Sequence, residues 1–227
     1  MGGKETTPAR FDFVFLTVGA WPNFNDPWTD QGIEKTVALD LLSRHVVLED
    51  LMEFGLVQSG ACIMSTLAST QQVPIPFPPE AIQQRLAESI NRTKVPGMVP
   101  FSLFPVAIAV DAWLIHLSKL HPNMHFVGMF PGIIATDIFA SSFPSWLAPI
   151  FKLFLTPLAI TEEESGWAHV AIATSQNVRR NHVSFLNHLL EGRYVHPSAT
   201  KQDLAAWVWN FAEMLRTQYL YNNSKIK

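Results

Sequence analysis

The spacing of apolar and polar residues predicts short buried strands separated by helices. Residues 11–18 (FDFVFLTV) are apolar and rich in β-forming residues, and the run ends at Gly19, which is typical of a buried strand of a parallel sheet. Residues 61–65 and 125–130 have the same character, and a further strand is predicted over residues 182–186. The pattern therefore indicates about four strands.

Helical periodicity fills the intervals between these strands. Apolar side chains recur at helical spacing over residues 30–55, and residues 106–120 are apolar on nearly every side, which predicts a helix buried on more than one side. Residues 161–174 begin with a threonine followed by three glutamates, the pattern of a capping box. Further helices are predicted over residues 79–91 and after Thr200, the expected N-cap of a final amphipathic helix.

This alternation of strands and helices predicts an α/β fold, in which a parallel sheet of about four strands carries helices on both faces. No internal repeat or linker divides the 227 residues, so a single domain is expected. Within it, residues 1–10 are expected to be a flexible N-terminus, residues 11–195 to hold the sheet, and residues 196–227 to hold the C-terminal helix.

Charge and hydropathy exclude several classes of function. The chain has 16 Lys and Arg against 19 Asp and Glu, a net charge of −3, and no basic run. Nucleic-acid binding is not expected, because it depends on clustered Lys and Arg. The polar N-terminus is unlike a signal peptide, so a cytoplasmic protein is expected. The most apolar segment, residues 143–160, contains three prolines and Lys152, which predicts a buried or pocket-covering segment and no membrane span.

The cysteine and histidine positions give no redox or metal motif. Cys62 is the single cysteine, which excludes a disulfide framework, a CxxC pair and a multi-thiolate zinc site. His121 and His125 have the spacing of metal ligands, but Pro122 and Asn123 lie between them, so a solvated turn is expected and no metal site is predicted.

Five segments carry the most recognisable sequence, in this order: FDFVFLTVGAWPN, GIEKTVALDLLSR, GACIMSTLAS, VPFSLFPVAIAVDAWLIHLSKLHP and FVGMFPGIIATDIF. They resemble the fourth to sixth strands and the adjoining helices of the short-chain dehydrogenase/reductase family, and more narrowly its divergent fungal members in secondary metabolism. The resemblance spans residues 11–195. It implies a Rossmann-like sheet, NADP or NAD as cofactor, and carbonyl reduction or alcohol oxidation on a hydrophobic small molecule.

The residues that hold the cofactor in this family are only partly present. Pro131, Gly132, Ile133 and Thr136 match the loop that would hold the nicotinamide amide, and Gly19 ends the turn that faces the adenosine in the family. The glycine-rich phosphate loop has no counterpart, since no two of the 11 glycines form a G-x-G pattern. The sequence begins where the family's fourth strand does, so we expect a truncated sheet that lacks the N-terminal nucleotide-binding portion.

The catalytic positions of the family are also changed. Its Tyr-x-x-x-Lys pair, in which the tyrosine donates a proton and the lysine lowers the pKa of the tyrosine, falls on Phe101 and Pro105. Neither side chain has an ionisable group. The catalytic serine falls on Thr66 or Leu67, beside Ser65. Hydride transfer by this chain alone is therefore not expected.

Three residues stand as candidates for acid–base chemistry in a non-redox step such as isomerisation, dehydration or cyclisation: Asp40, Ser65 and Asp111. Asp40 occupies the position of the family's helper asparagine. Both aspartates lie in apolar helical segments, where burial raises the pKa of a carboxyl group and favours a general base. The alternative for each aspartate is a satisfied structural hydrogen bond.

Two other interpretations stay open. In the first, the chain is a non-catalytic partner of an intact homologue. In the second, it is a shortened form of an NAD(P)-dependent oxidoreductase. In the family, the helices that match residues 33–54 and 106–120 form the dimer seam, and the second is apolar enough to need a partner. A homodimer, or a heterodimer with a homologue, through these two helices is therefore expected.

Overall fold

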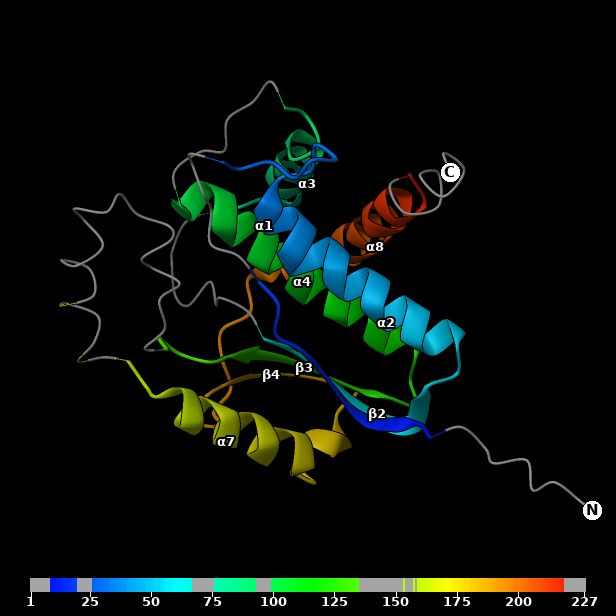
Figure 1. Ribbon diagram of the computed structural model, residues 1–227, viewed down its shortest axis with the longest axis vertical. Helices are drawn as coiled ribbons and strands as arrows, with labels where there is room; N and C mark the ends of the chain where they lie inside the picture. The colour runs from blue at the N-terminus through cyan, green and yellow to red at the C-terminus, as the bar shows by residue number, and fades with distance from the viewer. Residues whose placement is uncertain are drawn as a thin grey trace, which may run out of the picture.

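A four-stranded parallel sheet forms the centre of a computed structural model that describes residues 9–19, 26–66, 76–92, 99–134, 153, 157 and 159–218, without the side chains of residues 99–102. The strands lie side by side in the order β1 (Phe11–Leu16), β2 (Val57–Thr66), β3 (His125–Phe130) and β4 (Val183–Asn187). Every neighbouring pair is parallel. Helices cover both faces of the sheet (Figure 1), so the predicted Rossmann-like α/β fold class is confirmed.

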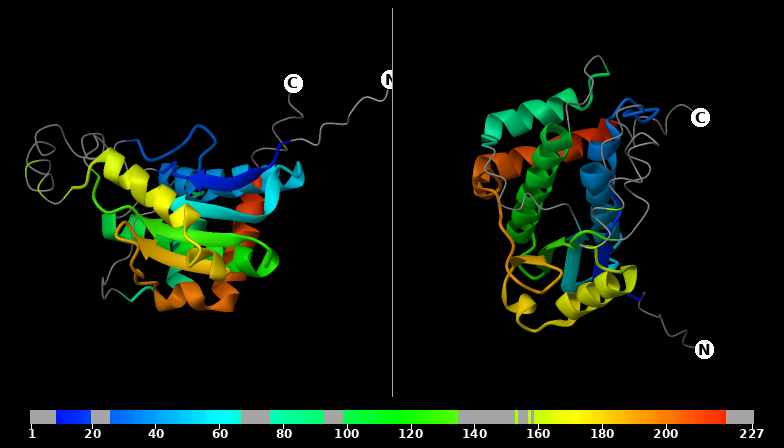
Figure 2. Two further views of the ribbon diagram at one scale, coloured as in Figure 1. Left: turned by 90° about the horizontal axis from the view of Figure 1, so that it is seen from below. Right: turned by 90° about the vertical axis from the view of Figure 1, so that its left-hand side faces the viewer.

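Within the described part of the chain, most of the helices lie on one face of the sheet, and α7 (Glu162–Thr174) lies on the other (Figure 2). The opposite face carries a continuous helix that consists of α1 (Lys35–Val37), the π-helical turn η1 (Ala38–Leu42) and α2 (Ser43–Glu53). It also carries α3 (Pro79–Glu88), α4 (Val99–Leu120) and α8 (Gln202–Arg216), while the short 3₁₀ turns are η3 (Val178–Arg180) and η4 (Pro197–Thr200).

The alternation of side chains along β2 explains why both faces need helices. Ile63 belongs to the hydrophobic cluster beneath α2, α4 and α8, whereas Cys62 and Met64 belong to a second cluster beneath α7. Successive side chains of a strand point to opposite faces, so a strand that is apolar at every position must be covered twice. The uninterrupted apolar run of β2 therefore fits an inner strand of a doubly covered sheet.

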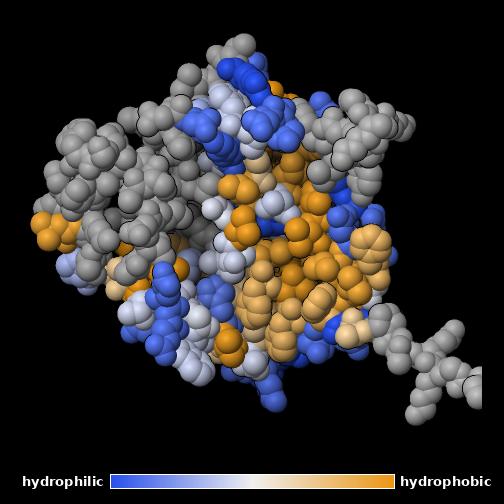
Figure 3. Space-filling view, viewed as in Figure 1, coloured by the Kyte–Doolittle hydropathy of each residue, from blue (hydrophilic) through white to orange (hydrophobic). Residues whose placement is uncertain are grey.

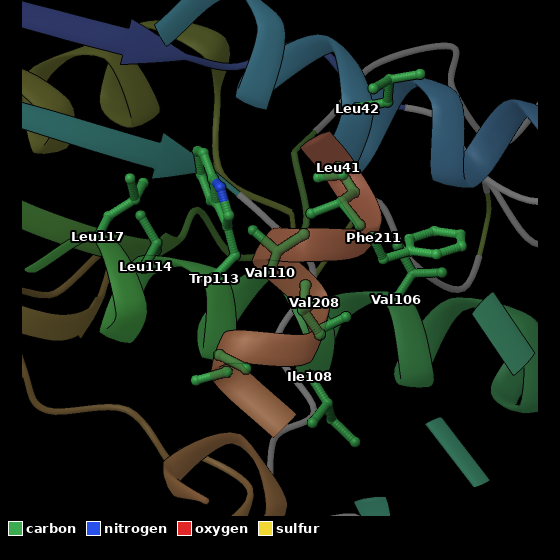
Figure 4. Packing of buried hydrophobic residues seen from close by; sticks show 14 of the residues in the cluster. Leu41, Leu42, Val106, Ile108, Val110, Trp113, Leu114, Leu117, Val208 and Phe211 are labelled. Carbon is green, nitrogen blue, oxygen red and sulfur yellow. The ribbon is translucent and has the colours of Figure 1, made fainter. Parts of the chain in front are cut away.

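Helix α4 is buried because the sheet lies on one side of it and α8 on the other. Trp113, Ile108 and Leu117 of α4 have no exposed surface, and Val208 and Phe211 of α8 pack in the same cluster (Figure 4). The stretch Leu103–Leu120 is long and apolar enough to cross a membrane, but 72% of it is buried inside the fold, as in the core helix of a globular protein. Helix α8 thus supplies the apolar cover that the sequence of α4 requires.

Two predictions about helix ends have opposite outcomes. The capping box is confirmed: the backbone N–H of Glu164 donates to Thr161 Oγ1 at 3.1 Å, and the backbone N–H of Thr161 donates to Glu164 Oε2 at 2.8 Å. The predicted cap at Thr200 is wrong. The Thr200 hydroxyl donates to the carbonyl oxygen of Pro197 inside η4, and Lys201 is the N-cap residue of α8. Pro197 starts a separate 3₁₀ turn, and its carbonyl oxygen accepts the hydrogen bond from the Thr200 hydroxyl.

A buried histidine joins three of these helices. His45 of α2 accepts a hydrogen bond from Trp113 Nε1 of α4 at 3.1 Å and donates from Nε2 to Glu213 Oε1 of α8 at 2.9 Å. Burial lowers the pKa of His45, and the charge of Glu213 partly offsets this effect. The arrangement needs the neutral ring, because Nδ1 must accept the Trp113 hydrogen. His45 therefore fixes α8 in register on α2 and α4.

The edge at β1 leaves apolar side chains exposed. Phe11 and Phe15 of β1 expose 50% and 42% of their surface, and Val47 of α2 and Phe54, the residue that follows this helix, are also exposed. Figure 3 shows an apolar surface over these two elements. The expected association through residues 33–54 and 106–120 stays a prediction. Helix α8 of the same chain already covers much of α4, so α2 is the less covered of these two helices.

Candidate functional site

The candidate site lies where β1, β2 and β3 end at their carboxyl termini. In open parallel sheets, ligands bind outside this edge, because the loops after the strands converge there. The loops that follow carry Gly19 after β1 and Pro131, Gly132 and Ile133 after β3. Ser65 and Thr66 end β2 between them.

Arg44 is the organising side chain of this edge on the α2 face. Its Nε and Nη2 atoms donate to the carbonyl oxygen of Val18 at 3.1 and 2.7 Å, and Nη1 donates to the hydroxyl of Ser65. Burial lowers the pKa of Arg44 to about 10, against the opposing effect of the nearby Asp40 carboxylate. Arg44 therefore remains charged at neutral pH and joins α2, the loop after β1 and the end of β2.

Asp40 lies one helical turn before Arg44 and packs on Gly19. A Cβ atom at Gly19 would lie 2.6 Å from Asp40 Oδ1, so this close approach requires glycine. The structure thus brings together three predicted site residues, Asp40, Ser65 and Gly19, around one arginine. Asp40, Arg44 and Ser65 expose 3%, 2% and 0% of their surface, so this cluster offers no open polar surface in the structure. The catalytic roles of Asp40 and Ser65 stay predictions.

Asp111, the third catalytic candidate, forms a buried ion pair with Arg193. Arg193 Nη1 donates to Asp111 Oδ2 at 2.9 Å, and Nη2 donates to the other carboxylate oxygen. Arg193 Nε also donates to the carbonyl oxygen of Gly128 at 3.2 Å. Burial raises the pKa of the Asp111 carboxyl group, and the Arg193 charge lowers it. Both carboxylate oxygens are occupied, which favours the structural alternative for Asp111.

The Pro131–Ile133 loop is held from two sides. Gly132 has φ = +80°, a conformation that favours glycine, and a Cβ atom there would lie 2.8 Å from His188 Nδ1. The carbonyl oxygen of Ile133 accepts a hydrogen bond from the backbone N–H of Ile160 at 2.8 Å. The loop is thereby joined to the segment that leads into α7. Thr136, the fourth predicted member of this loop, lies outside the described residues.

The family's Tyr and Lys positions lie in the first two turns of α4. Pro105 is buried inside this helix, and the side chain of Phe101 lies outside the described part of the structure. A benzyl group and a pyrrolidine ring have no proton to donate and no charge to lower a neighbouring pKa. The proton donor of the family reaction is thus absent at these two positions of the chain.

At this edge, the residues that the structure describes do not fit the dinucleotide that the resemblance implies. Binding a dinucleotide requires backbone that the ligand can approach closely and polar groups that are free to recognise it. Here Asp40 covers Gly19, Arg44 occupies the carbonyl oxygen of Val18, and His188 lies against Gly132. We therefore derive no reaction step through NAD or NADP.

A second polar pair at this edge was not identified from the sequence. Thr66 Oγ1 lies 2.7 Å from Nε2 of His169, which belongs to α7. The two residues are separated by 103 positions, so no local spacing indicated the pair. Arg44 was also missed, although its position four residues after Asp40 on one helix is the spacing of an ion pair. Cys62 offers no alternative nucleophile, because burial raises its pKa to about 11.

Comparison with known proteins gives a distant relative. No family model matches the chain. The protein named "Oxidoreductase AN1596" of Emericella nidulans is 22% identical over 165 residues, which are 71% of this chain and 46% of that protein. The chain therefore spans about half the length of the relative that it matches. This similarity supports an oxidoreductase-like relationship for a chain with a Rossmann-like parallel sheet.

Proposed function

We propose that this chain is an oxidoreductase-related protein that binds a hydrophobic small molecule at the carboxyl edge of its sheet and does not transfer hydride by itself. The observation that carries the proposal is that side chains of the protein itself already contact the backbone at this edge. Arg44, Asp40 and His188 occupy the backbone that a dinucleotide would need. The absence of a proton donor at positions 101 and 105 supports it. A non-redox step in a biosynthetic pathway is the chemistry that remains compatible with these residues.

The apolar nature of the ligand is inferred from the surface beside this edge. Phe15 near the end of β1 and Val18 in the loop that follows expose 42% and 57% of their surface. Exposed apolar groups next to buried polar groups favour a ligand that contributes mostly apolar area. The resemblance to enzymes of secondary metabolism points in the same direction.

Titration of the purified full chain tests this proposal. We expect no saturable binding of NADPH by calorimetry, and saturable binding of an apolar fluorescent probe, 1-anilinonaphthalene-8-sulfonate. Val18→Ser should weaken probe binding about five-fold, because about 1 kcal/mol of apolar contact is lost. Val47→Ser, which changes a similarly exposed valine on α2, is the matched control. Micromolar NADPH binding, or equal weakening by both variants, contradicts the proposal.

A second candidate function is that of a partner subunit, and the position of β1 in the sheet favours it. Among the described residues β1 pairs with β2 alone, so it is an edge strand, and an apolar surface lies over β1 and α2 (Figure 3). An exposed parallel-sheet edge beside apolar side chains is a surface at which another chain can pack. The partner would be a second copy of this chain or an intact homologue.

Light scattering of the chain alone tests the self-association form of this candidate. We expect the mass of a dimer at tens of micromolar, and a shift toward monomer for Phe54→Ser, which removes an apolar side chain that is 74% exposed. Leu189→Ser, at an exposed leucine in the loop after β4, should leave the mass unchanged. A monomeric mass at every concentration excludes the homodimer.

A further inference from the structure

Thr66 and His169 form a hydroxyl–imidazole pair at the carboxyl end of β2. Thr66 is the last residue of the strand, and its side chain lies on the face that α7 covers, opposite to that of Ser65. The Oγ1 atom lies 2.7 Å from Nε2 of His169. Both side chains are only partly buried, unlike the enclosed cluster around Arg44 on the other face.

The hydrogen bonds of His169 determine which ring nitrogen carries the proton. His169 Nδ1 lies 2.7 Å from the carbonyl oxygen of Ser165, which can only accept, so Nδ1 is the protonated nitrogen. In the neutral ring, Nε2 is then an acceptor, and the hydroxyl of Thr66 donates to it. The three groups form a relay: the hydroxyl of Thr66 faces the basic Nε2 atom of His169, and the carbonyl oxygen of Ser165 orients the imidazole ring.

This relay has the geometry of an activated nucleophile. Nucleophilic hydroxyl groups in enzymes lie within about 2.6–3.2 Å of a base that a further group orients, and this pair meets both conditions. The ring of Phe15 lies 6.3 Å from the ring of His169 and is partly exposed, so an apolar group has a surface to pack on beside the hydroxyl. Ser65, by contrast, is fully buried and faces a cation rather than a base.

We propose that Thr66 is a nucleophile that accepts the acyl group of a hydrophobic ester, with His169 as its base. Thr66 Oγ1 attacks the ester carbonyl carbon, and its proton passes to His169 Nε2. The bond from that carbon to the leaving alkoxy oxygen breaks, and the alcohol leaves with the proton from Nε2. Water then cleaves the acyl-threonine ester, giving a carboxylic acid and returning the proton to Thr66. This reaction needs only water, and it does not depend on the isomerisation, dehydration or cyclisation for which Asp40 and Ser65 are candidates.

Covalent labelling of the full chain by an alkyl fluorophosphonate, located by mass spectrometry of peptides, tests this proposal. We expect an adduct on Thr66 that forms at least 100-fold faster than one on Thr200, an exposed threonine whose hydroxyl donates to a backbone carbonyl oxygen. His169→Gln should slow labelling of Thr66 at least 100-fold. His182→Gln, which changes an exposed histidine away from this pair, should leave the rate unchanged.

A purely structural role for the pair gives a different result. In that case Thr66 labels no faster than Thr200, or labels equally fast in His169→Gln, and either outcome overturns the proposal. If His169→Gln does not fold, Thr66→Ser decides the question, because it keeps the hydroxyl and removes only a methyl group. In a reactive site, this variant labels at position 66 at least as fast as the unchanged protein does, and it releases a burst of p-nitrophenolate from p-nitrophenyl butyrate. Absence of both labelling and burst overturns the proposal as well.

Discussion

Replacing Asp111 by alanine lowers the free energy of unfolding by about 3–5 kcal/mol, the range found when one partner of a buried ion pair is removed. The change leaves the guanidinium of Arg193 without its carboxylate, and the side chain of Arg193 is only 1% exposed. Urea denaturation followed by tryptophan fluorescence measures the loss as a shift of the midpoint. Asp203→Ala, at an exposed aspartate in the first turn of α8, should change the stability by less than about 0.5 kcal/mol.

A double variant separates the ion pair from a role of Asp111 in proton transfer. Asp111→Leu combined with Arg193→Met removes both charges and keeps apolar volume, so much of the lost stability should return. The ion-pair explanation fails if Asp111→Ala is as stable as the unchanged protein. It also fails if the free energy of unfolding of the double variant lies well below that of Asp111→Ala, as it would if the two substitutions acted independently.

Arg44→Met should be similarly destabilising, by about 3–5 kcal/mol, because it leaves the buried Asp40 carboxylate without its neighbouring cation. It also removes both donors to the carbonyl oxygen of Val18 and the donor to Ser65. Thermal or urea denaturation gives the size of the effect. Arg180→Met, at an exposed arginine in η3, is the control and should be close to neutral.

Two further variants identify what Arg44 contributes. Arg44→Lys keeps the positive charge but not the fork of donors, so we expect an intermediate loss. Asp40→Leu combined with Arg44→Met removes the buried carboxylate together with its neighbouring cation and should be more stable than Arg44→Met alone. A loss below about 1 kcal/mol for Arg44→Met would show that this cluster does not hold the carboxyl edge together.

The main elements of the fold could be predicted from local patterns alone. The strand at residues 125–130 and the capping box at Thr161 depend on neighbours in the chain, and both are observed as predicted. The strand β2 is longer than expected, since it starts at Val57 and contains Gly60 with φ = +82°. The prediction that Thr200 caps the last helix was wrong because a threonine hydroxyl can bond to several nearby backbone groups. Here it donates to the carbonyl oxygen of Pro197 in η4.

The candidate site was predictable only in part, for a reason that Ser65 and Thr66 illustrate. These adjacent residues point to opposite faces of the sheet, as the period of a strand requires. Their partners are Arg44, 21 positions earlier, and His169, 103 positions later. The alternation is a local property of the strand, but the identity of the group on each face depends on which helix packs there.

Taken by itself, the sequence determined the α/β class, the approximate number of strands and the need of α4 for apolar cover on every side. These properties follow from hydrophobic periodicity, which acts through residues a few positions apart. Only the tertiary structure decided that α8 provides this cover, that Asp111 pairs with Arg193, and that His169 faces Thr66. The physical reason is that directional hydrogen bonds and ion pairs form between groups that are close in space, and distance along the chain does not limit them.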